Sequence, residues 1–150
     1  MVTRAKLTAQ PSARVLLVDD NRSGLVARQS VLEELGYATD ATTDSVKAFE
    51  MFREQPYDLV VTDYKMAELD GIELIGKLRQ EKPGVPVILI SGFVDALGLN
   101  ENNTGASAVI MKSANEVQHL VRCVARLVKL PRKPARSERA TLAARKKAAP

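Results

Sequence analysis

The stretch Val15-Leu16-Leu17-Val18-Asp19-Asp20 joins a short apolar run to two carboxylates. Three later apolar runs also end in a polar residue: 59–62 before Asp63, 87–90 before Ser91 and Gly92, and 108–111 before Lys112. Short runs rich in Val and Ile, without polar alternation, are typical of strands buried on both faces of a parallel sheet. Helical segments lie between the runs, so the sequence predicts a βαβ series with parallel strands.

The polar residues after these runs are expected to meet. Parallel strands end on the same edge of a sheet, and open α/β sheets bind ligands at that carboxyl edge. Three carboxylates, the Ser91 hydroxyl and the Lys112 ammonium group are therefore expected to converge on one small site. Oxygen ligands of this kind suit Mg²⁺, which usually takes only a few carboxylates and keeps several waters.

This set of groups suits chemistry at phosphorus. A carboxylate beside a divalent cation and Lys112 stays ionised and can act as a nucleophile, as in formation of an aspartyl phosphate. The cation and Lys112 would offset the charge that develops on the phosphoryl oxygens, and Ser91 could donate one hydrogen bond. Gly92 has no side chain and would leave room for an incoming phosphoryl group.

Five repeats of strand and helix are expected along the chain. The strands are predicted at residues 14–19, 37–41, 57–63, 86–91 and 107–111. The helices are predicted at 22–35, from Thr43 or Asp44 to Glu54, at 72–81, 94–102 and 114–129. Asn21 suits the cap of the first helix, and Gly36 suits the position just past its end. The helix at 94–102 contains several Gly and Asn residues, so we expect it to be short, frayed or mobile.

The last predicted helix carries apolar residues at the spacing of one helical face. The stripe consists of Val117, Leu120, Val121, Val124, Leu127 and Val128. His119 falls opposite this stripe and is expected to be exposed to solvent. Cys123 lies at its margin and is expected to be a packed thiol without chemistry.

Composition and charge limit the classes of protein. The chain of 150 residues has one cysteine, so it cannot form an internal disulfide, and no apolar run approaches the length that spans a bilayer. Its net charge of +4 is uneven, because residues 131–150 carry +6, residues 1–13 carry +2 and the rest carries −4. An acidic body argues against nucleic-acid binding by the body itself, and a single cysteine is compatible with a cytoplasmic location.

At these motifs the chain resembles the receiver domains of response regulators in two-component signalling. The resemblance covers about residues 13–130. It rests on Leu-Val-Asp19-Asp20-Asn, on Asp63-Tyr-Lys-Met66 followed by Asp70-Gly71, on Ile-Ser91-Gly and on Met-Lys112. It implies an α/β fold: a doubly wound, five-stranded parallel sheet in the order 2-1-3-4-5 with helices on both faces.

The resemblance also assigns roles to the site. Asp63 would be the phosphoacceptor. Asp19 and Asp20, with the backbone carbonyl of Lys65, would bind Mg²⁺ or Mn²⁺ beside it. Ser91 and Lys112 would sense the phosphoryl group. The family receives this group from a phosphohistidine of a sensor histidine kinase or phosphotransfer protein.

Other positions are expected to tune or transmit the signal. Lys65, Gly92 and Phe93 lie where the family controls access of water to the phosphoryl group. Ser113 replaces the usual proline after the lysine, which leaves open whether the bond before it is cis or trans. Val109 replaces the aromatic residue of the family's switch. Ala67 replaces a common proline and should loosen the acceptor loop slightly.

The prediction is a single-domain response regulator made of a basic leader (1–12), a receiver domain (13–130) and a basic, flexible tail (131–150). It would work in a phosphorelay through contacts with other proteins. These contacts would lie on the face formed by the fourth predicted helix (94–102), the fifth strand (107–111) and the fifth helix (114–129), and no membrane would be bound. It would catalyse only its own phosphorylation and dephosphorylation.

Three alternatives remain open. The basic tail could serve a nucleic-acid-binding regulator, and the chain could be a receiver from a larger hybrid kinase, although Met1 and the short leader argue against that. A small Mg²⁺-dependent phosphatase is disfavoured, because Lys65 stands where that class needs a second aspartate.

A strand-end aspartate such as Asp20, taken alone, is often only a helix cap.

Overall fold

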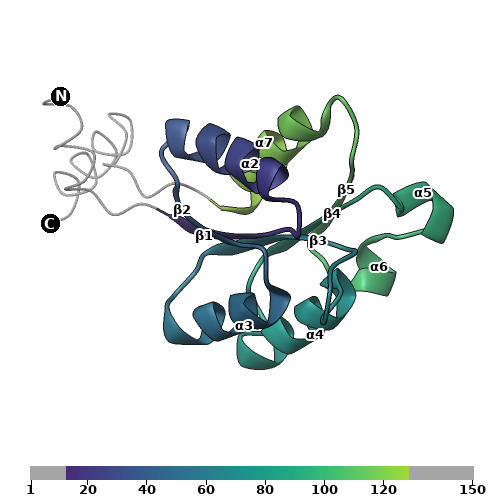
Figure 1. Cartoon of the computed structure of the whole chain (residues 1–150), viewed down its shortest axis with the longest axis horizontal. Coiled ribbons are helices and arrows are strands. Elements are labelled where there is room, and N and C mark those ends of the chain that lie inside the picture. Colours follow the sequence, from purple (N-terminus) through teal and green to yellow (C-terminus); the bar gives the residue numbers. More distant parts are fainter. Residues whose placement is uncertain (1–12, 129–150) are drawn as a thin grey trace, which may run out of the picture.

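The structure is a computed structural model that describes residues 13–128. The strands are β1 (Arg14–Val18), β2 (Ala38–Thr42), β3 (Leu59–Asp63), β4 (Val87–Ser91) and β5 (Ala108–Met111). They form one parallel sheet in the order β2-β1-β3-β4-β5, which confirms the expected doubly wound fold (Figure 1).

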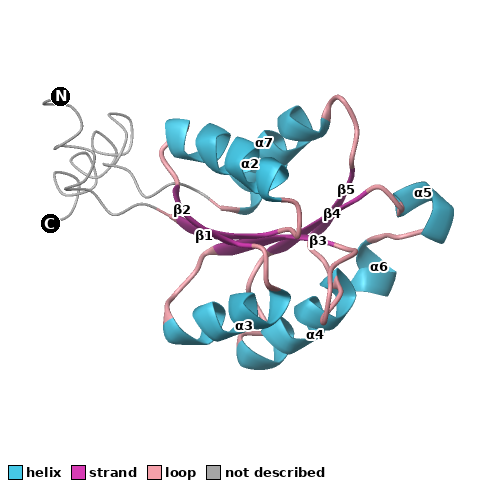
Figure 2. Cartoon of the chain, in the orientation of Figure 1, coloured by secondary structure: helices cyan, strands magenta, loops and turns pink. Residues whose placement is uncertain are grey.

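Helices cover both faces of this sheet. They are α2 (Arg22–Glu34), α3 (Ser45–Glu54), α4 (Gly71–Glu81), α5 (Val94–Leu97), α6 (Glu101–Thr104) and α7 (Glu116–Leu127). Figure 2 shows α2 and α7 on one face and α3 and α4 on the other. The chain thus has three layers, with the sheet in the middle.

The apolar core is divided by the sheet into two halves. Val15 and Leu17 of β1 pack with the cluster under α2 and α7, whereas Leu16 and Val18 pack with the cluster under α3 and α4. Every residue of β3 and β4 is buried, since these central strands are covered on both faces. This is the physical reason for their continuous apolar runs.

Polar side chains begin three of the helices at the carboxyl edge of the sheet. Asn21 accepts a hydrogen bond from the Gly24 backbone N–H, which confirms it as the cap of α2. Asp44, one of the two expected starting residues, caps α3. Asp70 and Glu73 form a reciprocal capping box at the start of α4. These caps fix where the chain turns from each strand into the next helix.

The structure corrects two predictions. A continuous helix at 94–102 is wrong: α5 and α6 are single turns separated at Gly98, which has a left-handed φ of 62°. The expected shortness is confirmed, because Gly98 ends the first turn. The predicted stripe of α7 is only partly buried, since Leu120 and Val124 are covered whereas Val117 is 38% exposed.

The predicted exposure of His119 and the predicted packing of Cys123 are confirmed. His119 is exposed, and Cys123 is half-buried against the core. No helix within residues 13–128 is long and apolar enough to cross a membrane. The predicted leader (1–12) and tail (131–150) lie outside the described residues, as does the boundary at residue 130.

Candidate functional site

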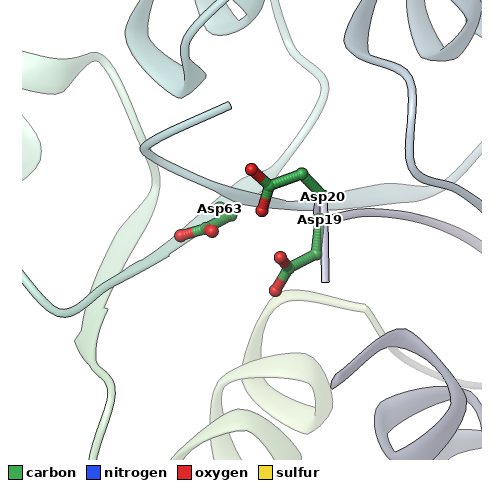
Figure 3. Close-up of side chains that lie close together, drawn as sticks. All are labelled: Asp19, Asp20 and Asp63. Atoms are coloured by element: carbon green, nitrogen blue, oxygen red, sulfur yellow. The ribbon is translucent and has the colours of Figure 1, made fainter. Parts of the chain in front are cut away.

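Three carboxylates meet at the carboxyl edge of the sheet. Asp19 and Asp20 follow β1, and Asp63 is the last residue of β3, the strand that pairs with β1. One oxygen of each carboxylate lies within 4.8 Å of the others, and Figure 3 shows the three side chains together. Asp19 and Asp63 are buried, whereas Asp20 is exposed. The expected convergence is confirmed, and it follows from the adjacency of two parallel strands.

Lys112 joins this cluster from the end of β5. Its Nζ lies 3.1 Å from Asp63 Oδ2 and 3.6 Å from Asp19 Oδ2. The Lys112 backbone N–H donates to the Ser91 carbonyl at 2.9 Å, which holds the start of this loop against β4. The ammonium group therefore bridges the buried carboxylates of two strands.

A second cation at the site was not predicted from the sequence. Arg28 of α2 donates from Nη1 to Asp19 Oδ2 at 2.7 Å, and the arginine is only 4% exposed. The sequence feature that could have revealed Arg28 is its position on the apolar face of α2. It lies three residues after Leu25 and four before Leu32, both of which are buried. A charge on a buried helix face requires partners, and here they are Asp19 and Glu116.

The two buried carboxylates differ in their electrostatics. Burial by itself raises the pKa of Asp19, yet the Asn21 N–H, Arg28 and Lys112 together hold that pKa below its ordinary value. Burial and the negative charge of Asp19 raise the pKa of Asp63, against the opposing effect of Lys112. Of the two buried carboxylates, Asp63 is thus the one whose negative charge is less compensated by the protein.

The donor set fits a hard divalent cation. Three carboxylates gather from neighbouring strands, all with oxygen donors, which is the ligand type that Mg²⁺ selects. The exposed Asp20 leaves one side open to water, as Mg²⁺ requires because it keeps several water ligands. A cation here would also relieve the repulsion between Asp19 and Asp63.

The remaining predicted site residues surround this cluster. Ser91 is fully buried at the end of β4, and its Oγ accepts the Phe93 backbone N–H at 2.9 Å. A Cβ at Gly92 would meet no atom within 4 Å, so the space beside it is open. The Lys65 Nζ lies 5.4 Å from the centre of the Phe93 ring, which also makes an edge contact with Tyr64.

The two expected switch positions lie along β5 and the loop after it. No peptide bond within residues 13–128 is cis, so the bond before Ser113 is trans. Ser113 Oγ accepts the Asn115 N–H at 3.2 Å at the start of α7. Val109 is half-buried, and its N–H donates to Glu101 Oε2 at 3.2 Å. The carboxylate of α6 thereby satisfies a donor on the edge strand.

The acceptor loop after Asp63 is held by a residue that the sequence analysis did not select. Ser45 of α3 is 1% exposed, donates from Oγ to the Ala67 carbonyl at 3.0 Å, and accepts the Leu69 N–H at 3.1 Å. These two bonds restrain the loop around Ala67, where we expected slight loosening.

Comparison with known proteins defines the class. The model of the response regulator receiver domain matches residues 15–124. The chain therefore belongs to the response regulator receiver domain family. The receiver fold, the two-component motifs and the acidic cluster agree with this assignment.

Individual relatives differ in length. The chain is 32% identical to the response regulator receiver protein CpdR of Brucella abortus over 90 residues, which are 60% of this chain and 74% of CpdR. It is 34% identical over 79 residues to the transcriptional regulatory protein ZraR of Klebsiella oxytoca, 53% of this chain but only 18% of ZraR. The chain thus matches only a small part of this longer relative.

A solved structure supports the fold along most of the domain. The response regulator TrrA of Thermotoga maritima, solved in complex with Mg(2+)-BeF, superposes with a TM-score of 0.70 at 28% identity. The match covers 77% of this chain and 99% of TrrA.

Proposed function

We propose that the protein is a single-domain response regulator that accepts a phosphoryl group on Asp63. The donor would be a phosphohistidine of a sensor histidine kinase or phosphotransfer protein. The observation that carries this proposal is the buried Asp63 carboxylate, 3.1 Å from Lys112 Nζ and within a cluster of two further carboxylates.

The residues around Asp63 supply the chemistry. An Asp63 oxygen attacks phosphorus and forms the acyl phosphate, while the bond from phosphorus to the histidine nitrogen breaks and the imidazole leaves with the electron pair. Lys112 offsets negative charge on the transferred oxygens. Ser91 Oγ already accepts the Phe93 N–H, so its hydroxyl hydrogen is available to donate to a phosphoryl oxygen.

Asp19, Asp20, Asp63 and the backbone carbonyl of Lys65 would hold the divalent cation, Mg²⁺ or Mn²⁺. When bound, the cation would neutralise charge on the phosphoryl oxygens. The complex of TrrA with Mg(2+)-BeF supports this part of the proposal, since TrrA is a related response regulator.

The side chains of Lys65 and Phe93 would set the lifetime of the phosphoryl group. Their cation–π contact at 5.4 Å joins the segment that follows Asp63 to the segment that follows Ser91, and an ammonium group held there would restrict the approach of water. Lys65→Ala should change the dephosphorylation rate, whereas Lys47→Ala, an exposed lysine on α3, should not. Equal rates for Lys65→Ala and wild type would reject this role.

The output surface would be the face formed by α5, α6, β5 and α7. Leu97, Met111 and Val117 on these elements are 51%, 37% and 38% exposed, and their apolar side chains would contact a protein partner. Receiver domains interact with histidine kinases or phosphotransfer proteins, and a downstream protein would bind this face. Val109 and Ser113 would transmit the state of the site to it.

The protein would act as a switch in the cytoplasm, not as an enzyme on an external substrate. Its only reactions would be its own phosphorylation and hydrolysis of the resulting acyl phosphate. The longer relative ZraR favours a second candidate, a receiver within a larger protein. In either case the phosphorylation chemistry at Asp63 is the same.

The test is an intact-mass measurement after incubation with acetyl phosphate and Mg²⁺. We expect one phosphoryl increment on the wild type, labile to hydroxylamine and absent without the cation. Asp63→Asn should show no increment, whereas Asp95→Asn, at an exposed position on α5, should match the wild type. An increment on Asp63→Asn equal to that of wild type would contradict the assignment.

A further inference from the structure

Arg28 is the most completely buried cation among the described residues. It lies on α2 between Leu25 and Leu32, on the face that packs against the sheet, and it is 4% exposed. A buried guanidinium group is costly unless charged partners compensate for its lost hydration. Its partners therefore identify what it does in the fold.

Arg28 connects two elements that are far apart in the sequence. Its Nη1 donates to Asp19 Oδ2 at 2.7 Å, while Nε and Nη2 donate to Glu116 Oε2 at 2.9 and 2.7 Å. Glu116 is the first residue of α7, and its side chain is 17% exposed. One rigid guanidinium plane thus joins the acidic cluster to the start of a helix on the candidate output face.

The contacts of Asp19 give this bridge a consequence for cation binding. Asp19 Oδ1 accepts the Asn21 N–H at 2.9 Å, and Oδ2 accepts from Arg28. Both oxygens are already engaged by donors of the protein. An entering divalent cation must share Asp19 with Arg28, and the two positive charges repel each other at short range.

Glu116 also affects the competition between Arg28 and a cation for Asp19. Its negative charge offsets that of Arg28 and draws the guanidinium group toward α7. When a cation weakens the hold of Asp19 on Arg28, the pair of Arg28 and Glu116 must readjust. Any such readjustment occurs at the first turn of α7, because Glu116 begins that helix.

We propose that Arg28 is a positioning residue that lowers the cation affinity of the acidic cluster and couples its occupancy, through Glu116, to the first turn of α7. The proposal rests on the divalent cation in the proposed function. It adds a connection that bypasses Ser91, Val109 and the loop at Ser113. By linkage, if the cation changes the affinity of α7 for a partner by some factor, that partner changes the affinity for the cation by the same factor.

The test is a titration of the full chain with Mg²⁺ alone, followed by amide NMR. The amides of Asp19, Asp20 and Asn21 report binding, and those of Glu116 to Leu120 report the response of α7. Arg28→Met removes the charge and places an unbranched, apolar side chain in the buried position. Glu116→Gln keeps the shape and removes the opposite charge at a position that water can reach.

The two variants should move affinity in opposite directions. Arg28→Met should bind Mg²⁺ about tenfold more tightly, because one positive charge beside the site is gone. Glu116→Gln should bind about threefold more weakly, because the charge of Arg28 is then less compensated. The α7 amides should respond to Mg²⁺ in the wild type and lose most of that response in both variants.

Matched controls separate this effect from general electrostatics. Arg122→Met on α7 and Glu34→Gln on α2 make the same charge changes at exposed positions. Both should stay close to wild type, because screening by solvent and salt weakens exposed charges. A merely structural role for Arg28 would lower affinity in both test variants, so opposite shifts are specific to the proposal.

Each outcome decides the question. Three results would overturn the proposal and leave cation-dependent phosphorylation intact. They are affinity changes of the same sign in both test variants, affinity changes equal to those of the controls, and α7 amides of the wild type that do not respond to Mg²⁺. If Arg28→Met does not fold, Arg28→Gln replaces it, because glutamine removes the charge but keeps a polar side chain. Arg28→Gln must then bind Mg²⁺ more tightly than the wild type, and weaker binding would overturn the proposal. A wild type that binds no Mg²⁺ at Asp19 to Asn21 would overturn both this inference and the cation of the proposed function.

Discussion

A side chain added at Gly71 would collide with the backbone, so replacing this glycine tests how α4 packs beside Asp63. A Cβ built on Gly71 would lie 2.4 Å from the Asp63 carbonyl oxygen, 2.7 Å from Leu89 Cδ1 and 2.9 Å from Tyr64 Cα. The Gly71 N–H also donates to the Tyr64 carbonyl at 2.7 Å. The start of α4 therefore rests directly on the backbone that carries the acceptor aspartate.

The cost of Gly71→Ala follows from these distances. Ordinary contacts of a Cβ begin at 3.4 Å, so α4 or the end of β3 must shift by about 1 Å. Two of the three obstructing atoms belong to the backbone, and Leu89 is fully buried. Overpacking costs roughly 1–3 kcal/mol, and the rigid backbone favours the upper end, about 3 kcal/mol.

Gly76 is a matched control within the same helix. A Cβ there would meet nothing within 4 Å, and alanine is the better helix former by about 1 kcal/mol. Gly76→Ala should therefore stabilise the protein, and the free energies of unfolding of the two variants should differ by about 4 kcal/mol.

Urea unfolding followed by far-ultraviolet circular dichroism measures both free energies of unfolding, and thermal unfolding should show Gly71→Ala melting about 10 °C below wild type. Two results would refute the packing argument: a Gly71→Ala protein within about 0.5 kcal/mol of wild type, or shifts of the same sign in both variants.

Three further predictions concern the buried polar groups. Ser45→Ala should cost about 1–3 kcal/mol and speed amide exchange at Leu69, because two loop groups lose their partner, whereas the exposed Ser30→Ala should do neither. The raised pKa of Asp63 means that its contribution to stability is complete at low pH and is lost as pH rises through the folded pKa. Metal-free Asp63→Asn should therefore melt above wild type near neutral pH, with a difference that shrinks on acidification; the opposite order of melting temperatures would contradict this sign. Burial and the hydrogen bond to Asp40 raise the pKa of Tyr57, so its stabilising effect is complete below the unfolded pKa of about 10 and lost above it. Urea midpoints should then fall more steeply above about pH 10 in wild type than in Tyr57→Phe, and parallel curves would exclude Tyr57 as the cause.

Local sequence patterns predicted a parallel sheet with helices between its strands, whereas the strand order was predicted only from the resemblance to receiver domains. The apolar runs at β1, β3, β4 and β5 identify strands covered on both faces, and the helices between them require parallel strands. Parallel strands end on one edge, so the sequence predicted that Asp19, Asp63 and Lys112 meet, and the structure confirms it. The expectation failed at residues 94–102, where Gly98 divides the segment into two turns.

The balance of charge in the site required the tertiary structure. The motifs identify Asp19 and Asp63 equally as carboxylates at strand ends, but only their burial and neighbours give them opposite pKa shifts. Arg28 and Glu116 are separated by 88 residues, and neither belongs to a motif. Periodicity records which face of an element is buried, because burial repeats along that element. It does not record which charges meet after packing, since a pair across two helices depends on their relative placement and on the removal of water around both groups.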